Sequence, residues 1–189
     1  MKTVTEYNII RSKRKTISLE ITDSAQLLVR APMRVPQYEI KRFVDEKSDW
    51  IEKHIEKAKK RIEKAQDIEP ISRWELRDIA DEALRVIPVR VRYFADIIGV
   101  TYGRITIRNQ KTLWGSCSLK GNLNFNCMLM RTPEHVRDYV IVHELCHRKE
   151  MNHSPRFWEL VGSVIPDYKQ CRKWLKEEGS ALLISSHAG

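Results

Sequence analysis

The sequence has little glycine or proline, seven of each in 189 residues, and it has no long apolar run. No stretch approaches the roughly 18 consecutive apolar residues that a transmembrane helix needs. The first residues, Met1–Glu6, also lack the apolar core of a signal peptide. With 42% hydrophobic residues, the composition is nevertheless that of a folded globular protein. We therefore expect a cytoplasmic protein with no membrane partner.

Cysteine is equally sparse. Four cysteines occur at irregular spacing without a CxxC pair: Cys117, Cys127, Cys146 and Cys171. This pattern argues against a disulfide framework, because such frameworks concentrate many cysteines in small secreted domains. We expect all four to be reduced thiols.

Negative charge is in deficit, and the deficit is largest near the N-terminus. Lys and Arg number 34 against 25 Asp and Glu, and residues 1–65 hold 16 of the basic and 10 of the acidic residues. The densest basic cluster is Arg11, Lys13, Arg14 and Lys15. This basic lobe could bind nucleic acid or a nucleotide weakly, or its charges could protect a strand edge from pairing. We favour edge protection, because the cluster has no interleaved aromatic residues for base stacking.

Apolar periodicity predicts a β-hairpin and then helices in the first third of the chain. Residues 17–21 alternate between apolar and polar, and a turn leads into a second strand at Leu27–Val29. Residues 36–62 have helical spacing. A short joint then separates residues 1–67 from residues 68–189, and we expect the two parts to form one continuous compact unit.

The second part is predicted to alternate helices with a small sheet. Ser72 caps a helix, and Pro88 is expected to begin another helix that stops at Gly99. Three antiparallel strands follow, at residues 104–108, 113–118 and 123–126. The predicted class is α+β, with a small antiparallel sheet packed on a central helix and with an N-terminal β-hairpin and helical lobe.

That central helix carries the segment His143-Glu144-Leu145-Cys146-His147, an HExxH motif. Residues four apart lie about 40° apart around a helix, so both imidazoles can reach one metal ion. The histidines share a helical face with Val136 and Tyr139, which predicts that they point into the protein. Two unpaired buried imidazoles are costly, and a metal ion satisfies both. Cys146 is expected to be a small buried hydrophobe.

A third histidine, His153, follows six residues after His147. Asn152 tolerates the left-handed conformation that ends helices, and Ser154-Pro155 resembles an N-cap followed by a first-turn proline. His153 is therefore expected in a tight bend that can fold it over the metal. We favour it over three other candidates for the third ligand: Cys117, Glu150 and Glu159.

Three histidine ligands leave the fourth position of tetrahedral zinc open to water, which is the arrangement of a catalytic zinc site. Glu144 lies about 100° around the helix from His143, beside the ligands and not among them. In this chemistry zinc lowers the pKa of its water and Glu144 accepts the proton as general base. The predicted site is therefore zinc at His143, His147 and His153, with Glu144 as the catalytic residue.

Three segments, Trp114–Cys117, His143–His147 and Asn152–Trp158, together resemble the YgjP-like family of zinc metallopeptidases, near the SprT-like and WLM groups. The basic strand Ile10–Leu19 is also similar, so the resemblance covers nearly the whole chain. It implies a zincin-like fold, zinc bound by the three histidines and a catalytic Glu144. Cys127 departs from the family pattern, which has a tryptophan at that position.

Zincin-like enzymes hold an extended substrate at a sheet edge, so we expect a peptide or protein substrate. Two alternatives stay open. The same metal chemistry could hydrolyse a nucleotide phosphoanhydride, although no Gly-rich phosphate loop is present. The protein could also be a nucleic-acid-associated, SprT-like peptidase that docks through its basic N-terminal lobe.

Overall fold

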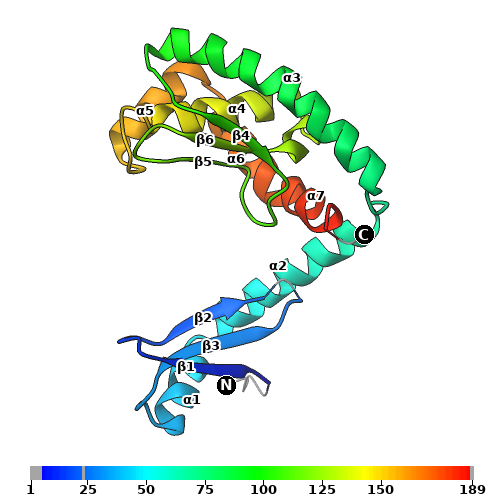
Figure 1. The fold of residues 1–189 in the computed structure, drawn as a ribbon. Coiled ribbons are helices and arrows are strands. Elements are labelled where there is room, and N and C mark those ends of the chain that lie inside the picture. The colour runs from blue at the N-terminus through cyan, green and yellow to red at the C-terminus, as the bar shows by residue number, and fades with distance from the viewer. Residues whose placement is uncertain (1–5, 23, 188–189) are drawn as a thin grey trace. The chain divides into compact units, whose positions relative to one another are not determined.

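The computed structural model describes residues 6–22 and 24–187, and the chain divides into two compact units, Met1–Asp67 and Ile68–Gly189 (Figure 1). The elements of the first unit are β1 (Asn8–Ser12), β2 (Ser18–Ile21), β3 (Leu27–Pro32), α1 (Gln37–Glu46) and α2 (Ser48–Gln66). Those of the second are α3 (Arg73–Ile98), β4 (Ile105–Arg108), β5 (Gly115–Cys117), β6 (Leu123–Asn126), the 3-10 helix η1 (Cys127–Arg131), α4 (Glu134–Cys146), α5 (Pro155–Val164), α6 (Tyr168–Trp174), the π-helix η2 (Leu175–Gly179) and α7 (Ser180–Ser185). Among the described residues, no helix has both the length and the apolar character that a membrane crossing needs.

The first unit contains a three-stranded sheet in the order β1-β3-β2. Strands β2 and β3 pair antiparallel, which confirms the predicted hairpin, and β1 adds a parallel strand on the other side of β3. The buried side of β3 packs with apolar residues of the two helices. These buried residues are Leu27, Val29, Ala31, Ile40, Val44 and Ile51.

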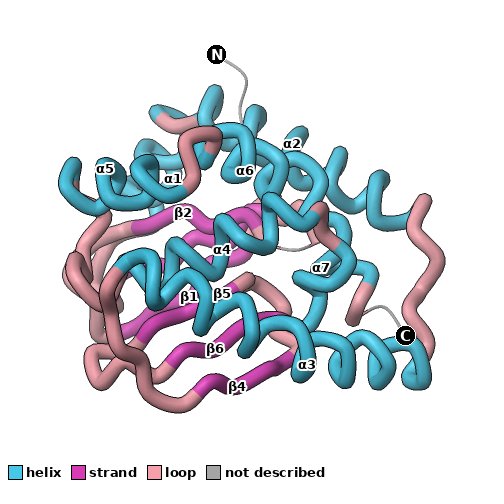
Figure 2. Tube along the Cα trace, turned by 90° about the horizontal axis from the view of Figure 1, so that it is seen from above, coloured by secondary structure: helices cyan, strands magenta, loops and turns pink. Residues whose placement is uncertain are grey.

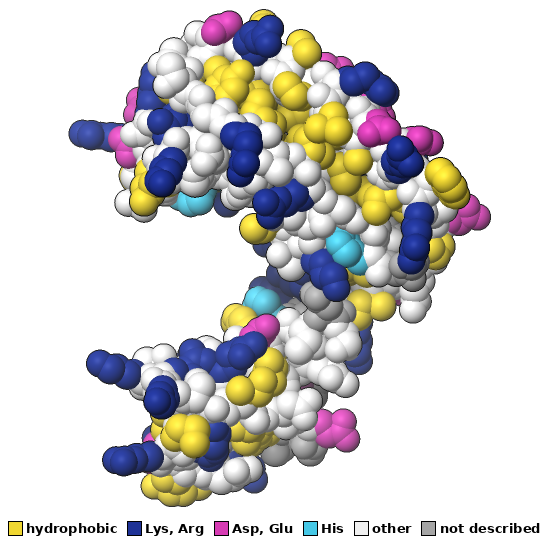
Figure 3. All heavy atoms as spheres, viewed as in Figure 1, with side chains coloured by type: hydrophobic (Ala, Val, Ile, Leu, Met, Phe, Trp, Pro, Cys, Tyr) yellow, Lys and Arg dark blue, Asp and Glu magenta, His cyan; other side chains and the backbone are white. Residues whose placement is uncertain are grey.

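Arg11, in the basic N-terminal cluster, is engaged within the fold. Its Nη1 donates to the carbonyl oxygens of Pro32, Met33 and Val35 at 3.1, 3.2 and 2.7 Å. This single side chain therefore ties β1 to the segment that leaves β3. Other Lys and Arg side chains project from the same unit in the space-filling view (Figure 3). Binding of nucleic acid or a nucleotide by the cluster stays a prediction.

Helix α3 is longer than the sequence suggested. Ser72 and Glu75 form a capping box at its start, and Gly99 ends it in the left-handed conformation with φ of 69°, as predicted. The prediction that Pro88 begins a separate helix is wrong, because the helix runs through it. The buried stripe of Ile87 and Val91 continues on both sides of the proline, and its burial outweighs one missing backbone hydrogen bond.

The second unit contains a mixed sheet in the order β4-β6-β5 and not the antiparallel sheet that we predicted. Strand β5 pairs antiparallel with β6, whereas β4 pairs parallel with β6 on its other side. The connection from β4 to β5 explains the difference. The Asn126 side-chain amide donates to the carbonyl oxygens of Gln110 and Leu113 at 2.8 and 2.9 Å, which holds this connection beside the end of β6.

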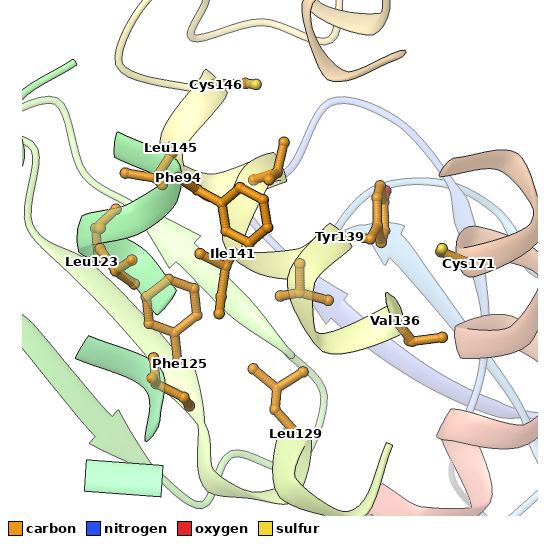
Figure 4. Packing of buried hydrophobic residues seen from close by; sticks show 14 of the residues in the cluster. Phe94, Leu123, Phe125, Leu129, Val136, Tyr139, Ile141, Leu145, Cys146 and Cys171 are labelled. Atoms are coloured by element: carbon orange, nitrogen blue, oxygen red, sulfur yellow. The ribbon is translucent and has the colours of Figure 1, made fainter. Parts of the chain in front are cut away.

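Helix α4 is buried on nearly every side. Figure 2 shows α3 running beside β4, and α4 packs against α3, β5, α5 and α6. Figure 4 shows Ile141 of α4 among Phe94, Leu123 and Phe125, which come from α3 and β6. On α4 the buried Asp138 carboxylate accepts two hydrogen bonds from Arg90 of α3, one of them at 2.9 Å from Nε. Apolar packing and this bidentate ion pair together fix the helix that carries the HExxH motif.

Candidate metal centre

Three histidine side chains converge at the C-terminal end of α4. His143 comes from α4, His147 is the C-cap residue directly after it, and His153 comes from the bend before α5. The Nε2 atoms of His143 and His153 are 3.0 Å apart, and the ligand-capable nitrogens of all three residues lie within 4.8 Å of one another. This spacing allows all three to coordinate a single metal ion.

Local turn chemistry folds His153 back over α4. The backbone N–H of Ser154 donates to the Asn152 carbonyl at 2.8 Å, which closes a tight turn around His153. The Ser154 side chain then accepts from the Phe157 N–H at 3.3 Å, and Pro155 occupies the first turn of α5. The predicted bend is therefore present, but Asn152 is not left-handed: in the described part of the chain, Ala25 is the one non-glycine residue with a positive φ.

Hydrogen bonds set the orientation of two of the rings. His147 Nδ1 lies 3.1 Å from the backbone oxygen of Glu150, so Nδ1 carries the proton and donates it to that carbonyl. His143 Nδ1 lies 3.4 Å from the Tyr139 hydroxyl. With Nδ1 engaged, Nε2 of each ring is left for a metal, which is the usual outer-shell arrangement of metal-binding histidines.

Aromatic side chains of α5 and α6 form a wall beside the histidines. Phe157 stacks on His147 with ring centroids 4.6 Å apart, and Trp158 stacks on His153 at 5.5 Å. Tyr168 stacks in turn on Trp158 at 5.4 Å. The wall restricts rotation of the imidazoles and keeps one side of the site apolar.

Burial favours the neutral form of the His143 and His153 imidazoles. It lowers the pKa of His143 to about 3, with smaller contributions from the other two histidines and from Arg172. Burial is also the main cause that lowers the pKa of His153. Neutral imidazoles carry the free lone pairs that a metal ion requires. The donor set therefore fits a metal ion with nitrogen preference, such as zinc.

Glu144 follows His143 in α4 and is only 5% exposed. Its Oε2 atom is buried and has no hydrogen-bond partner within the protein. Burial raises the pKa of this carboxyl to about 8. A buried carboxyl oxygen without a partner is costly to the fold, so the position of Glu144 points to a role in a reaction.

Gly115 on β5 makes room for this carboxyl group, a role that the sequence analysis missed. A Cβ atom at position 115 would lie 2.8 Å from Glu144 Cγ and 2.9 Å from Oε1. Glycine at this position therefore lets the strand approach the glutamate directly. The Trp114-Gly115 pair contained the signal, because a glycine inside a strand indicates a close approach of the backbone to another group.

Within residues 6–22 and 24–187, the other candidate ligands lie outside the histidine cluster. Neither Cys117 nor Glu159 belongs to it, and Glu150 contributes only its backbone oxygen, to His147. Burial and then the charge of Glu144 raise the pKa of the Cys117 thiol, which keeps it protonated. Cys146 is fully buried, as predicted.

Comparison with known proteins identifies the class as a metal-dependent hydrolase. The profile of the YgjP-like family, metallopeptidase domain, matches residues 15–77 and 73–178. The chain therefore belongs to the YgjP-like metallopeptidase family, as the sequence resemblance implied, and its α+β architecture confirms the predicted fold class.

Two solved structures are also similar in part. The metallopeptidase zymogen abylysin of Pyrococcus abyssi is 24% identical with a TM-score of 0.45, and the match covers 50% of this chain and 96% of that one. The metallopeptidase zymogen jannalysin of Methanocaldococcus jannaschii is 22% identical with a TM-score of 0.41, and the match covers 48% and 95% of the two chains. No curated protein matches the sequence.

Replacement of Gly115 by alanine should displace Glu144, because the added methyl group would overlap its side chain. We expect peptide hydrolysis to fall by about 10- to 100-fold, since a displacement of this size misaligns a reacting group. Metal content should not change. Activity assays and metal analysis of the purified variant measure both effects. Ser163→Ala, at an exposed position of α5, is the control. Full activity of Gly115→Ala would contradict this role.

The raised pKa of Glu144 predicts a pH-dependent stability of the metal-free protein. Folding favours the protonated carboxyl, so the associated stability is complete below pH 4.5 and is lost as the pH rises through about 8. Between about pH 7 and 8.5 we expect the free energy of unfolding to fall by about 1 kcal/mol. Urea titrations in EDTA measure it. Glu144→Gln should abolish most of this decrease in the free energy of unfolding. Glu159→Gln, on the exposed side of α5, should not. The same pH dependence of the free energy of unfolding in the wild type and in Glu144→Gln would refute the raised pKa of Glu144.

Proposed function

We propose that this YgjP-like protein is a zinc peptidase in which His143, His147 and His153 hold the metal and Glu144 is the general base. The observation that carries the proposal is the convergence of three imidazoles, together with a buried carboxyl oxygen without a partner on Glu144, the residue that follows His143. When bound, zinc lowers the pKa of a water molecule and polarises the carbonyl group of the substrate.

The position of Glu144 supports a proton-transfer role. Glu144 follows the ligand His143 in the chain but is not itself one of the three ligands. Its Oε2 atom has no hydrogen-bond partner and can accept the proton of an attacking water. The same oxygen can then donate that proton to the nitrogen of the departing amine. A buried carboxyl group binds a proton more tightly than an exposed one, which suits both steps near neutral pH.

The open edge of β5 supports an extended peptide as the substrate. Trp114 and Ser118 form backbone hydrogen bonds toward β6, at 2.9 and 3.0 Å. Backbone groups alternate sides along an antiparallel strand, so those of Gly115 and Cys117 face away from β6. Because Gly115 also contacts Glu144, a peptide paired with this edge would pass the catalytic carboxyl group.

Glu144→Gln tests the proposed base. The substitution keeps the shape of the side chain and removes its ability to accept a proton, so hydrolysis of an unstructured peptide should fall by about 10³-fold or more. Fold and metal content should stay as in the wild type. Circular dichroism, metal analysis and a quenched-peptide assay report the three properties. Activity within a few-fold of wild type would refute the general-base role.

Metal analysis with His153→Ala tests the ligand set. The wild-type protein should carry about one zinc per chain, because three imidazoles form the protein's share of a catalytic zinc site. Loss of His153 removes one ligand, so the zinc dissociation constant should rise by at least about 100-fold in chelator competition. Glu150→Gln, which leaves the backbone oxygen in place, is the matched control. Wild-type affinity in His153→Ala would return Cys117, Glu150 and Glu159 to consideration.

A further inference from the structure

Arg172 of α6 stands beside the metal centre and has no part in the site described so far. Its guanidinium carbon lies 4.3 Å from the centroid of the Trp158 ring. That ring stacks on His153 and lies 5.8 Å from His143, measured between centroids. The Trp158 ring therefore links the positive charge of Arg172 to the rings of two of the three proposed ligands.

The charge of Arg172 is not neutralised within the described part of the chain. No carboxylate there forms an ion pair with its guanidinium, and the side chain is exposed. Two cations that follow α4 in the chain have donors that are already engaged. Arg148 donates to the backbone oxygens of Thr101 and Leu119, and Lys149 donates to that of Ile98. Arg148 and Lys149 therefore use donors in hydrogen bonds within the protein, whereas the donors of Arg172 are available to a ligand.

Arg172 and His153 both contact the Trp158 ring, so the guanidinium charge lies one aromatic ring away from a proposed ligand. A cation at this position opposes binding of a metal cation, so it does not help to hold the ion. The group that it suits is an anion that forms during the reaction.

We propose that Arg172 is a further catalytic residue, which donates a hydrogen bond to the carbonyl oxygen of the scissile peptide as negative charge develops on it. The inference rests on the proposed peptidase function. When the water oxygen bonds to the carbonyl carbon, the π electron pair of the C=O bond moves to the carbonyl oxygen, and the water proton passes to Glu144. Arg172 keeps its own protons throughout and acts by charge and hydrogen bonding alone.

Tyr139, the other donor close to the ligands, is less suited to this role. Its hydroxyl lies 3.4 Å from His143 Nδ1, and its ring is buried in the core. Tyr139 therefore orients the His143 ring through Nδ1, the nitrogen that does not bind the metal. Arg172, by contrast, is exposed, so a substrate can reach its guanidinium.

The test compares Arg172→Gln and Arg172→Lys with Lys173→Gln, an exposed cation one residue further along the same helix. The substrate is a quenched peptide blocked at both ends, so that it carries no terminal carboxylate. We expect Arg172→Gln to lower kcat by roughly 100-fold with KM within threefold, and Arg172→Lys to recover part of the loss. Lys173→Gln should behave as wild type, and all variants should retain the metal.

A binding measurement provides a readout that does not depend on turnover. A phosphinic peptide carries a tetrahedral anionic group in place of the scissile bond, and its dissociation constant should rise by at least about 30-fold in Arg172→Gln. The affinity of the neutral peptide, measured by calorimetry in the inactive Glu144→Gln background, should change by less than threefold on adding Arg172→Gln.

Two outcomes overturn the role of Arg172 alone: unchanged phosphinate affinity in Arg172→Gln, or a rise in KM with kcat intact, which would assign Arg172 to ground-state binding. Both leave metal binding and the loss of activity in Glu144→Gln as expected. A wild-type protein that binds neither metal nor the phosphinic peptide would instead overturn the proposed function together with this inference.

Discussion

The burial of α4 is the constraint on which the rest of the structure depends. A helix enclosed by α3, the mixed sheet, α5 and α6 has no solvent to satisfy its polar side chains. The Asp138 carboxylate is hydrogen-bonded to Arg90. His143 Nδ1 is hydrogen-bonded to the Tyr139 hydroxyl, and His147 Nδ1 to the Glu150 carbonyl. Glu144 keeps one oxygen without a partner. Stability supplied by the apolar core thus maintains one buried, reactive carboxyl group.

The same burial determines the protonation states that the chemistry needs. Exclusion of water favours the neutral form of imidazoles and the protonated form of a carboxyl, so one physical cause moves the two kinds of pKa in opposite directions. Neutral histidines coordinate a metal, and a carboxyl with a raised proton affinity exchanges protons near neutrality. In the function that we propose, the edge of β5 would hold an extended peptide and the Arg172 guanidinium would supply a positive charge.

Several local features could be predicted because short-range chemistry controls them. The helix cap at Ser72, the helix end at Gly99 and the Ser154-Pro155 start of α5 all lie where the sequence predicted them. Predictions failed where distant contacts decide. The local sequence around Pro88 is typical of a helix start. The structure instead continues α3 through Pro88, because apolar residues on both sides of the proline pack in the core. Strand order also escaped prediction, because the Asn126 contacts that hold the β4–β5 connection join residues 13 and 16 positions apart.

The sequence by itself determined the chemical identity of the centre: two histidines one helical turn apart, a glutamate between them, and a third histidine in a bend that Ser154 and Pro155 enforce. These relations hold because helix periodicity and turn preferences act over a few residues. Only the tertiary structure decided that Gly115 contacts Glu144 and that the Arg172 guanidinium contacts the Trp158 ring. Such contacts join elements far apart in the chain, and they arise from the close packing of a whole core.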